Sequence, residues 1–197
     1  MEQWKDILKK CVEEAGAKFE KNELAFLALQ GKIELQLRDK IAWLLQQKYG
    51  DKYYIKKEYK RHDLAILDNN LNPKCLVEFK AHSSAKWEDK YKKFFEEDLA
   101  KMRNTVENGH YADVQLFYVF FQTIHTKTFR SKAERVLVPY SSAINQGVEQ
   151  KAENTLKEQW EKICSSESGE LLAAKIEAGK YLDDEVTIHA MIFGPKQ

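Results

Sequence analysis

The sequence has few cysteines, no glycine-rich loop and no histidine cluster, and each absence excludes a class of protein. The three cysteines are odd in number and widely spaced, so they support neither a disulfide framework nor a zinc site. No Gly-rich phosphate loop is present, which argues against an ATPase or a dinucleotide-dependent enzyme. The five histidines are scattered and form no HxxxH or HNH-like group. Zinc-dependent and nucleotide-dependent chemistry are therefore left without support.

Long hydrophobic runs are also missing. No apolar stretch approaches the length of a membrane span, and the start, Met-Glu-Gln-Trp-Lys-Asp, lacks a signal-peptide profile. We therefore expect an intracellular, cytoplasmic protein with no membrane partner. A chain of 197 residues with 43% hydrophobic and 32% charged residues can bury a sizeable core. We expect one domain over residues 1–197.

Two short apolar runs, each interrupted by charges, are the most informative feature that is present. The first is Arg-His-Asp63-Leu-Ala-Ile-Leu and the second is Cys-Leu-Val-Glu78-Phe-Lys80-Ala, with a polar turn between them. This pattern predicts a β-hairpin. With a loop at residues 69–72, residue 68 faces residue 73 and Asp63 lies directly opposite Glu78. Because side chains alternate along a strand, Glu78 and Lys80 share one face of the sheet.

Two carboxylates that face each other across a β-ladder repel unless a positive charge sits between them. A divalent cation is the natural candidate, since Mg²⁺ takes one or two carboxylates and leaves other positions to water and substrate phosphate. Lys80 would then orient or help deprotonate a water and offset phosphate charge. Alternatively, Lys80 forms a cross-strand ion pair with Asp63 or Glu78 on a solvated face. Apolar residues on both faces favour a covered sheet; they are Leu64, Ala65, Ile66, Leu67, Leu76, Val77, Phe79 and Ala81.

The elements predicted around this hairpin follow the order helix, strand, strand, strand, helix, strand. Upstream, residues 22–48 have apolar residues at helical spacing, with Gly31 as a break between two helices, and residues 53–59 alternate as a strand does. Downstream, residues 87–106 again show helical spacing, and residues 113–124 are apolar enough for a buried strand. The charged hairpin therefore lies in the middle of an α/β arrangement.

With this element order, Asp63, Glu78 and Lys80 resemble the PD-(D/E)XK nuclease superfamily, which includes restriction endonucleases, junction resolvases and exonucleases. Its members share an Asp, a spacer and Glu-x-Lys on adjacent strands, and the three residues match that pattern, with His62 where the motif's name has proline. The resemblance covers residues 22–124. It implies a restriction-endonuclease-like fold of the α/β (α+β) class, with an αβββαβ core whose mixed central sheet is flanked by helices.

The resemblance also implies an activity and a role for each site residue. It implies a Mg²⁺-dependent deoxyribonuclease of the restriction, repair or defence type, with Mn²⁺ as a substitute metal. Asp63 and Glu78, with the backbone carbonyl of Phe79, would hold one or two Mg²⁺ ions. The metal would polarise the scissile phosphate and lower the pKa of the attacking water, while Lys80 positions that water and stabilises developing charge.

Glu34 has two interpretations. In many members of the superfamily a helix before the sheet brings a further glutamate toward the metal, and Glu34 occupies such a place. It could equally form a surface pair with Arg38 four residues later. Two alternatives to the nuclease also stay open: a nucleic-acid-binding or scaffold protein that keeps the fold without catalysis, and an α+β interaction module whose charges form salt bridges.

The net charge of +1 makes the distribution of basic residues more informative than their sum. Lys60 and Arg61 come shortly before Asp63 in the sequence. A later segment contains four more basic residues and one acidic residue, Glu134. These residues could contact nucleic-acid phosphates, with DNA favoured over RNA, or could lie on solvated faces. The four later residues are Lys127, Arg130, Lys132 and Arg135.

The C-terminal extension, residues 125–197, lies outside the expected core. Its helical and strand additions could extend the sheet, bind DNA or form a homodimer surface. The first fifteen residues are expected to form an amphipathic helix. The elements predicted for the extension are strands at 135–140 and 186–193 and helices at 145–163 and 170–178.

Overall fold

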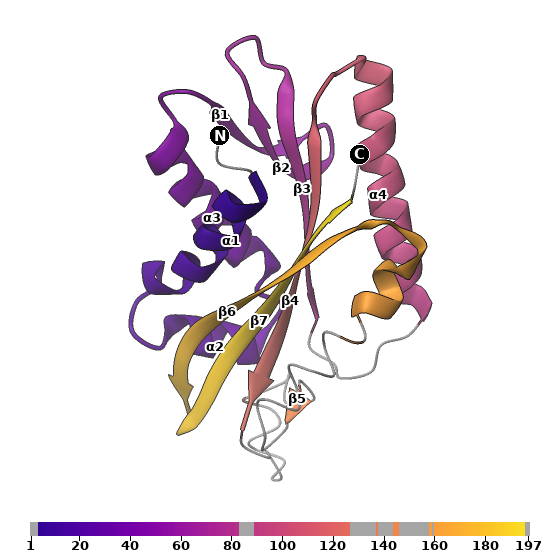
Figure 1. The fold of residues 1–197 in the computed structure, drawn as a ribbon. Coiled ribbons are helices and arrows are strands. Elements are labelled where there is room, and N and C mark those ends of the chain that lie inside the picture. The colour runs from indigo at the N-terminus through magenta and orange to yellow at the C-terminus, as the bar shows by residue number, and fades with distance from the viewer. Residues whose placement is uncertain are drawn as a thin grey trace.

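The computed structural model describes residues 4–82, 89–126, 137, 144, 145, 158 and 160–195. In this part of the chain a seven-stranded mixed sheet is flanked by helices (Figure 1). The α/β class expected from the sequence is confirmed at this level. Some expected features lie outside the described residues: the basic residues Lys127, Arg130, Lys132 and Arg135, the strand at 135–140 apart from Leu137, and most of the helix at 145–163.

Three helices cover one face of the sheet (Figure 1). The predicted N-terminal helix is confirmed as α1 (Trp4–Ala15), and the predicted pair of helices is confirmed as α2 (Glu23–Gln30) and α3 (Glu34–Tyr49), with Gly31 ending α2. A short 3-10 turn, Gly16–Lys18, follows α1. The apolar faces of the three helices and alternate strand residues form one buried core, which includes Leu8, Leu24, Leu37, Leu64, Val77 and Phe79.

The long helix α4 (Asp89–Gly109) covers the opposite face, together with a short helical segment that contains Trp160 and Ile163. Its residues Phe95, Leu99 and Met102 are buried, as their helical spacing predicts. They pack against the strand residues that point away from α1–α3, among them Leu76 and Tyr118. The sheet is therefore covered on both faces, which explains why its central strands are apolar almost throughout.

The predicted hairpin is confirmed, together with the strand before it. These strands are β1 (Tyr54–Tyr59), β2 (His62–Leu67) and β3 (Pro73–His82). Each pairs with the next in antiparallel fashion. Leu64 lies opposite Val77, so one further step along the ladder places Asp63 opposite Glu78, as the loop arithmetic predicts.

The ladder differs from the prediction at the loop end. The register shifts between Ile66 and Leu67, so that Leu67, rather than residue 68, lies opposite Pro73. Asp68 stabilises this longer loop, because its Oδ1 accepts hydrogen bonds from the backbone N–H groups of Asn70 (2.9 Å) and Asn72 (3.0 Å). The irregularity stays within the loop and leaves the pairing next to Asp63 unchanged.

The rest of the sheet is built on β4 (Gln115–His125), the strand predicted at 113–124. It runs parallel to β3 after the α4 connection and antiparallel to β7 (Asp184–Pro195), and the strand predicted at 186–193 is thereby confirmed. A two-residue strand, β5 (Ile144–Asn145), pairs with the end of β4. The sheet order is β1-β2-β3-β4-β7-β6.

The helix predicted at residues 170–178 is wrong, because this segment lies in strand β6 (Gly169–Tyr181). Its alanines, leucines and glutamates favour a helix by intrinsic propensity. However, Ala174, Ile176 and Ala178 are buried while Lys175 and Glu177 are exposed, which is the two-residue period of a strand. Pairing with β7 along its whole length overrides the local preference.

No helix among the described residues combines the length and the apolar character needed to cross a bilayer.

Candidate active site

Strands β2 and β3 bring Asp63, Glu78 and Lys80 together on the face that α4 covers. Glu78 and Lys80 alternate with Val77 and Phe79, which point to the other core. The Asp63 Oδ2 accepts a hydrogen bond of 2.7 Å from the backbone N–H of Phe79, and its carboxyl group also hydrogen-bonds that of Glu78. The three residues predicted from the sequence thus form one cluster.

The two carboxyl groups differ in their pKa values because their neighbours differ. Burial raises the pKa of Asp63 to about 7, and the negative charge of Glu78 adds to the effect. Burial also acts on Glu78, which is 1% exposed, but hydrogen bonds from His62 and Lys101 outweigh it and lower the pKa of Glu78. Asp63 is therefore the carboxyl group of the pair that takes up a proton near neutral pH, while Glu78 stays ionised.

Lys80 lies beside this pair as a charged group. Burial acts to lower its pKa, yet the nearby carboxylates of Asp98, Glu34 and Asp63 raise it overall. Its Nζ is 3.3 Å from the Asp98 Oδ2. An ammonium that stays protonated at neutral pH suits charge stabilisation and water orientation better than proton abstraction.

Helix α4 contributes two residues that sequence reasoning missed. The Lys101 Nζ lies 2.5 Å from the Glu78 Oε1 and 3.6 Å from the Asp98 Oδ1. Asp98 therefore bridges Lys80 and Lys101. Positive and negative charges alternate along the series Lys80, Asp98, Lys101 and Glu78. The only signal in the sequence is that Asp98 and Lys101 sit three residues apart beside the buried stripe of α4, a spacing that many surface pairs share. We define the hairpin site as Asp63, Glu78, Lys80, Asp98 and Lys101.

His62 contacts the Glu78 carboxylate of the hairpin site. Its side chain is fully buried, with Nδ1 2.8 Å from the Glu78 Oε1 and Nε2 2.7 Å from the Thr105 Oγ1. The Thr105 hydroxyl in turn donates to the backbone carbonyl of Lys101 at 3.1 Å. His62 thus links β2, β3 and α4 behind the Glu78 carboxylate.

Glu34 reaches the edge of the same site. It begins α3, and its Oε2 accepts a hydrogen bond of 3.0 Å from the backbone N–H of Ala81 on β3. Arg38, the alternative partner considered from the sequence, instead pairs with Glu58 and Asp39. Glu34 therefore lies next to Lys80 rather than in a surface pair.

The donor set at Asp63 and Glu78 fits a hard cation such as Mg²⁺. The two carboxyls are close enough to share a proton, and a divalent ion that replaces this proton would relieve their repulsion. Within the part of the chain that the structure describes, no group of three or more His, Cys, Asp or Glu side chains could enclose a metal. With two carboxyl groups as ligands, such an ion would take its remaining ligands from backbone, water and substrate.

Lys60 and Arg61, the described members of the predicted basic groups, form the turn between β1 and β2. Tyr59 pairs with His62 across this turn, so the loop consists of these two residues. They lie just before β2, at the end of that strand that carries Asp63.

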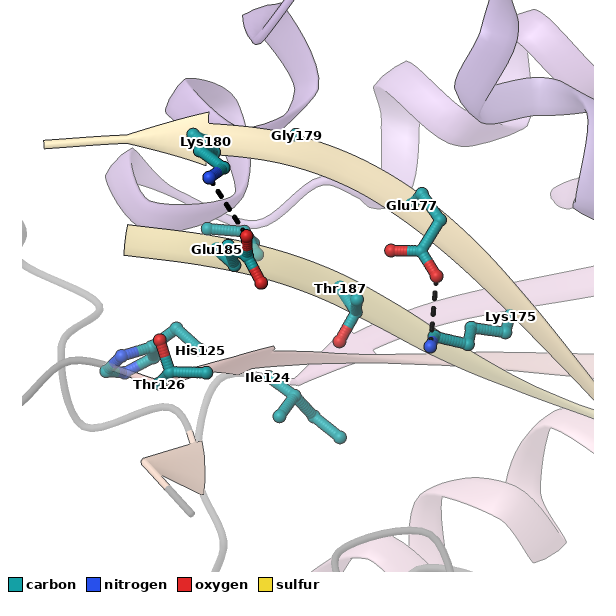
Figure 2. A pocket seen from close by; sticks show the side chains of 10 residues that line it. Ile124, His125, Thr126, Lys175, Glu177, Gly179, Lys180, Glu185 and Thr187 are labelled. Carbon is teal, nitrogen blue, oxygen red and sulfur yellow. Dashed lines mark ion pairs between the residues drawn. The ribbon is translucent and has the colours of Figure 1, made fainter. Parts of the chain in front are cut away.

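A second polar region lies at the far end of β4, in a pocket of about 580 Å³ between β4, β6 and β7 (Figure 2). Its lysines are paired with its glutamates: Lys175 with Glu177 and Lys180 with Glu185, both at 2.9 Å. These pairs compensate the charge on the pocket wall, so nothing there selects a ligand of either sign.

Comparison with known proteins gives no match, whether to a protein family, to a curated protein or to a solved structure.

Proposed function

We propose that this protein is a metal-dependent nuclease of the PD-(D/E)XK type that hydrolyses phosphodiester bonds of DNA. The observation that supports it best is the close approach of the Asp63 and Glu78 carboxyl groups beside the charged Lys80. Such a pair of like charges is unfavourable for stability unless a cation occupies the site during function. The element order α3, β1, β2, β3, α4, β4 also agrees with the αβββαβ core of that superfamily.

In the proposed mechanism Asp63 and Glu78, with the backbone carbonyl of Phe79, would hold Mg²⁺. The bound ion would polarise the scissile phosphate and lower the pKa of a water. His62 fixes the Glu78 carboxylate from behind, and the Phe79 N–H fixes that of Asp63. Lys80, held by Asp98, places a positive charge where the phosphorane-like transition state becomes more negative.

One contact favours the alternative, a nucleic-acid-binding protein that keeps this fold without cleaving. The Lys101 ammonium already neutralises Glu78, as a metal would. If Lys101 holds that position when DNA is bound, Glu78 cannot serve as a metal ligand and the site only binds phosphate.

The test is incubation of the purified full chain with supercoiled, linear and single-stranded DNA and with RNA, with Mg²⁺ or with EDTA. We expect Mg²⁺-dependent cleavage of DNA, reduced at least about 10²-fold by Asp63→Asn and by Lys80→Ala, with unchanged circular dichroism. The matched control, Asp51→Asn in an exposed turn, should cleave like the wild type. Binding without cleavage would support the alternative, and neither binding nor cleavage would refute both.

A further inference from the structure

A hollow of about 340 Å³ lies between the β1–β2 turn and α4. We call it the basic hollow. Three of its lining residues are cationic and three carry neutral polar groups, and no carboxylate is among the described residues that line it. These residues are Lys60, Arg61, Lys101, Asn104, Thr105 and Asn108. Of its three cations only Lys101 faces a glutamate in the described part of the chain, Glu78, whereas in the pocket of Figure 2 both lysines do.

The basic hollow and the hairpin site share a wall. Lys101 lines the hollow and also lies 2.5 Å from the Glu78 Oε1. Thr105 lines the hollow too, and its Oγ1 is 2.7 Å from His62, which contacts the same Glu78 oxygen at 2.8 Å. A group bound in the hollow would therefore lie next to the group bound at Asp63 and Glu78.

The turn that supplies two of the cations is not the most stable choice for its geometry. Lys60 and Arg61 have φ values of 48° and 70°, so both residues of this two-residue turn are left-handed. Such turns favour Asn-Gly, and a side chain at each left-handed position costs about 1 kcal/mol or more. A Lys-Arg pair in this turn therefore retains positive charge at the expense of the stability of the β1–β2 pair.

The Lys60 charge is held in place without being neutralised. The Lys60 Nζ donates to the Tyr111 hydroxyl at 2.9 Å and lies over the rings of Tyr59 (5.4 Å) and Tyr111 (5.1 Å). The hydrogen bond with Tyr111 raises the pKa of Lys60, so the ammonium stays charged. Among the carboxylates in the described ranges, none forms an ion pair with Lys60 or Arg61 within 4.0 Å.

We propose that the basic hollow binds a phosphate of the nucleic-acid strand, adjacent to the phosphate at the hairpin site. Lys60 and Arg61 supply charge, and the side-chain amides of Asn104 and Asn108 supply neutral donors. The proposal rests on the proposed function for the identity of the neighbouring phosphate. It assigns the β1–β2 turn a role in substrate positioning that is separate from catalysis.

The test uses Lys60→Asn/Arg61→Gly, which introduces the preferred turn sequence and removes both charges. The matched control is Lys52→Asn/Lys56→Asn, which removes two charges from exposed positions elsewhere on β1 and its approach. Binding of a fluorescent oligonucleotide is measured without Mg²⁺ over a range of salt concentrations, in the Asp63→Asn background so that cleavage cannot interfere.

We expect the turn variant to bind at least about 10-fold more weakly than the control. We also expect the slope of log K against log salt to fall by about 1 to 2, while the melting temperature stays equal or rises. Equal affinity and equal slope for the turn variant and the control would overturn the proposal, as would an absence of oligonucleotide binding by the parent protein. If only a 5′-phosphorylated end is affected, the hollow binds a terminal phosphate and not the internal one proposed.

These outcomes are distinct from those that test the nuclease. A protein that binds DNA through the turn but never cleaves it would keep the basic hollow and refute the proposed catalysis. If the protein cleaves DNA while the turn variant binds like its control, the proposed catalysis stands and the basic-hollow proposal is refuted.

Discussion

Among the described residues, two buried pairs join a histidine to a carboxylate, and their surroundings differ. In the hairpin site His62 lies 2.8 Å from Glu78, and at the end of β4 His125 lies 3.1 Å from Asp184. We call the second pair the β4 pair. Glu78 faces a second carboxyl group, whereas the Oδ1 of Asp184 accepts hydrogen bonds from the backbone N–H of Thr126 at 2.9 Å and from the Thr126 hydroxyl at 2.7 Å.

This difference separates a structural buried charge from one that is a candidate for chemistry. The hydrogen bonds of the β4 pair connect the end of β4 to the start of β7, so the charge stabilises the junction of two strands. The hairpin site instead keeps a repulsion that the surrounding fold has to offset. Burial and a histidine partner are shared by both pairs, so the second carboxylate is the feature that distinguishes them.

The largest expected effect is on cleavage, and it should affect only one of the two pairs. Glu78→Gln removes a proposed metal ligand, so the rate of DNA cleavage should fall at least about 10²-fold. Asp184→Asn keeps an acceptor for Thr126 and should leave the rate within about twofold of the wild type. Initial rates at saturating Mg²⁺ measure both. Equal losses in the two variants would show that the comparison does not mark the active site.

The next effect concerns stability, and it should be larger at the β4 pair. Asp184→Ala would leave the Thr126 N–H and hydroxyl without this acceptor, at a cost of about 2 to 4 kcal/mol in the free energy of unfolding. Glu78→Gln should cost less, because it also relieves the repulsion with Asp63. Urea denaturation measures both variants, with Asp51→Ala as the exposed control. A more destabilising Glu78→Gln would contradict this order.

The pH dependence of stability should sharpen the contrast through Asp63. Its folded-state pKa of about 7 lies above its ordinary value of 3.8, so the folded protein binds more protons than the unfolded chain between these limits. The contribution of Asp63 is therefore fully present below about pH 4 and is lost as pH rises through 7, with a slope of up to about 1.4 kcal/mol per pH unit.

Urea denaturation of metal-free protein from pH 4 to 8 measures this slope. Subtracting the profile of Asp63→Asn isolates the group, since the amide does not titrate. A difference that is flat, or that increases with pH, would contradict the raised pKa.

The smallest expected effect is stabilisation by the metal. At a Mg²⁺ concentration tenfold above its dissociation constant, the folded state should gain about 1.4 kcal/mol, seen as a rise in melting temperature. The gain should increase above pH 7, where the metal no longer competes with the Asp63 proton. It should disappear in Glu78→Gln and persist in Asp184→Asn. A rise that both variants retain would place the metal elsewhere.

Part of this site could be predicted from the sequence because it depends on short-range regularities. The two-residue period of a strand places Glu78 and Lys80 on one face, and a short polar loop sets the register that brings Asp63 opposite Glu78. The parts that were missed depend on long-range packing. Lys101 contacts Glu78 because of where α4 lies along the sheet and how the helix is rotated about its axis. The apolar stripe of α4 does not specify this placement closely enough to predict the contact.

The same distinction explains the incorrect helix at residues 170–178. When the segment is considered alone, Ala174 and Lys175 fit a helix better than a strand. Only the partner strand β7, which follows after a short turn, decides between the two. His62 illustrates a third case, since its residue type indicates neither that it is buried nor that Thr105 lies within reach on α4.

The shifted register between Ile66 and Leu67 has a consequence for engineering and for evolution of the chain. It confines the irregular part of the hairpin to the loop that Asp68 closes, and it leaves the pairing of Leu64 with Val77 intact. A change in loop length at residues 69–72 can therefore be absorbed without the one-residue slip that would turn Asp63 to the opposite face. This loop is where a reporter peptide or an affinity tag could be inserted with the least disturbance to the carboxylates.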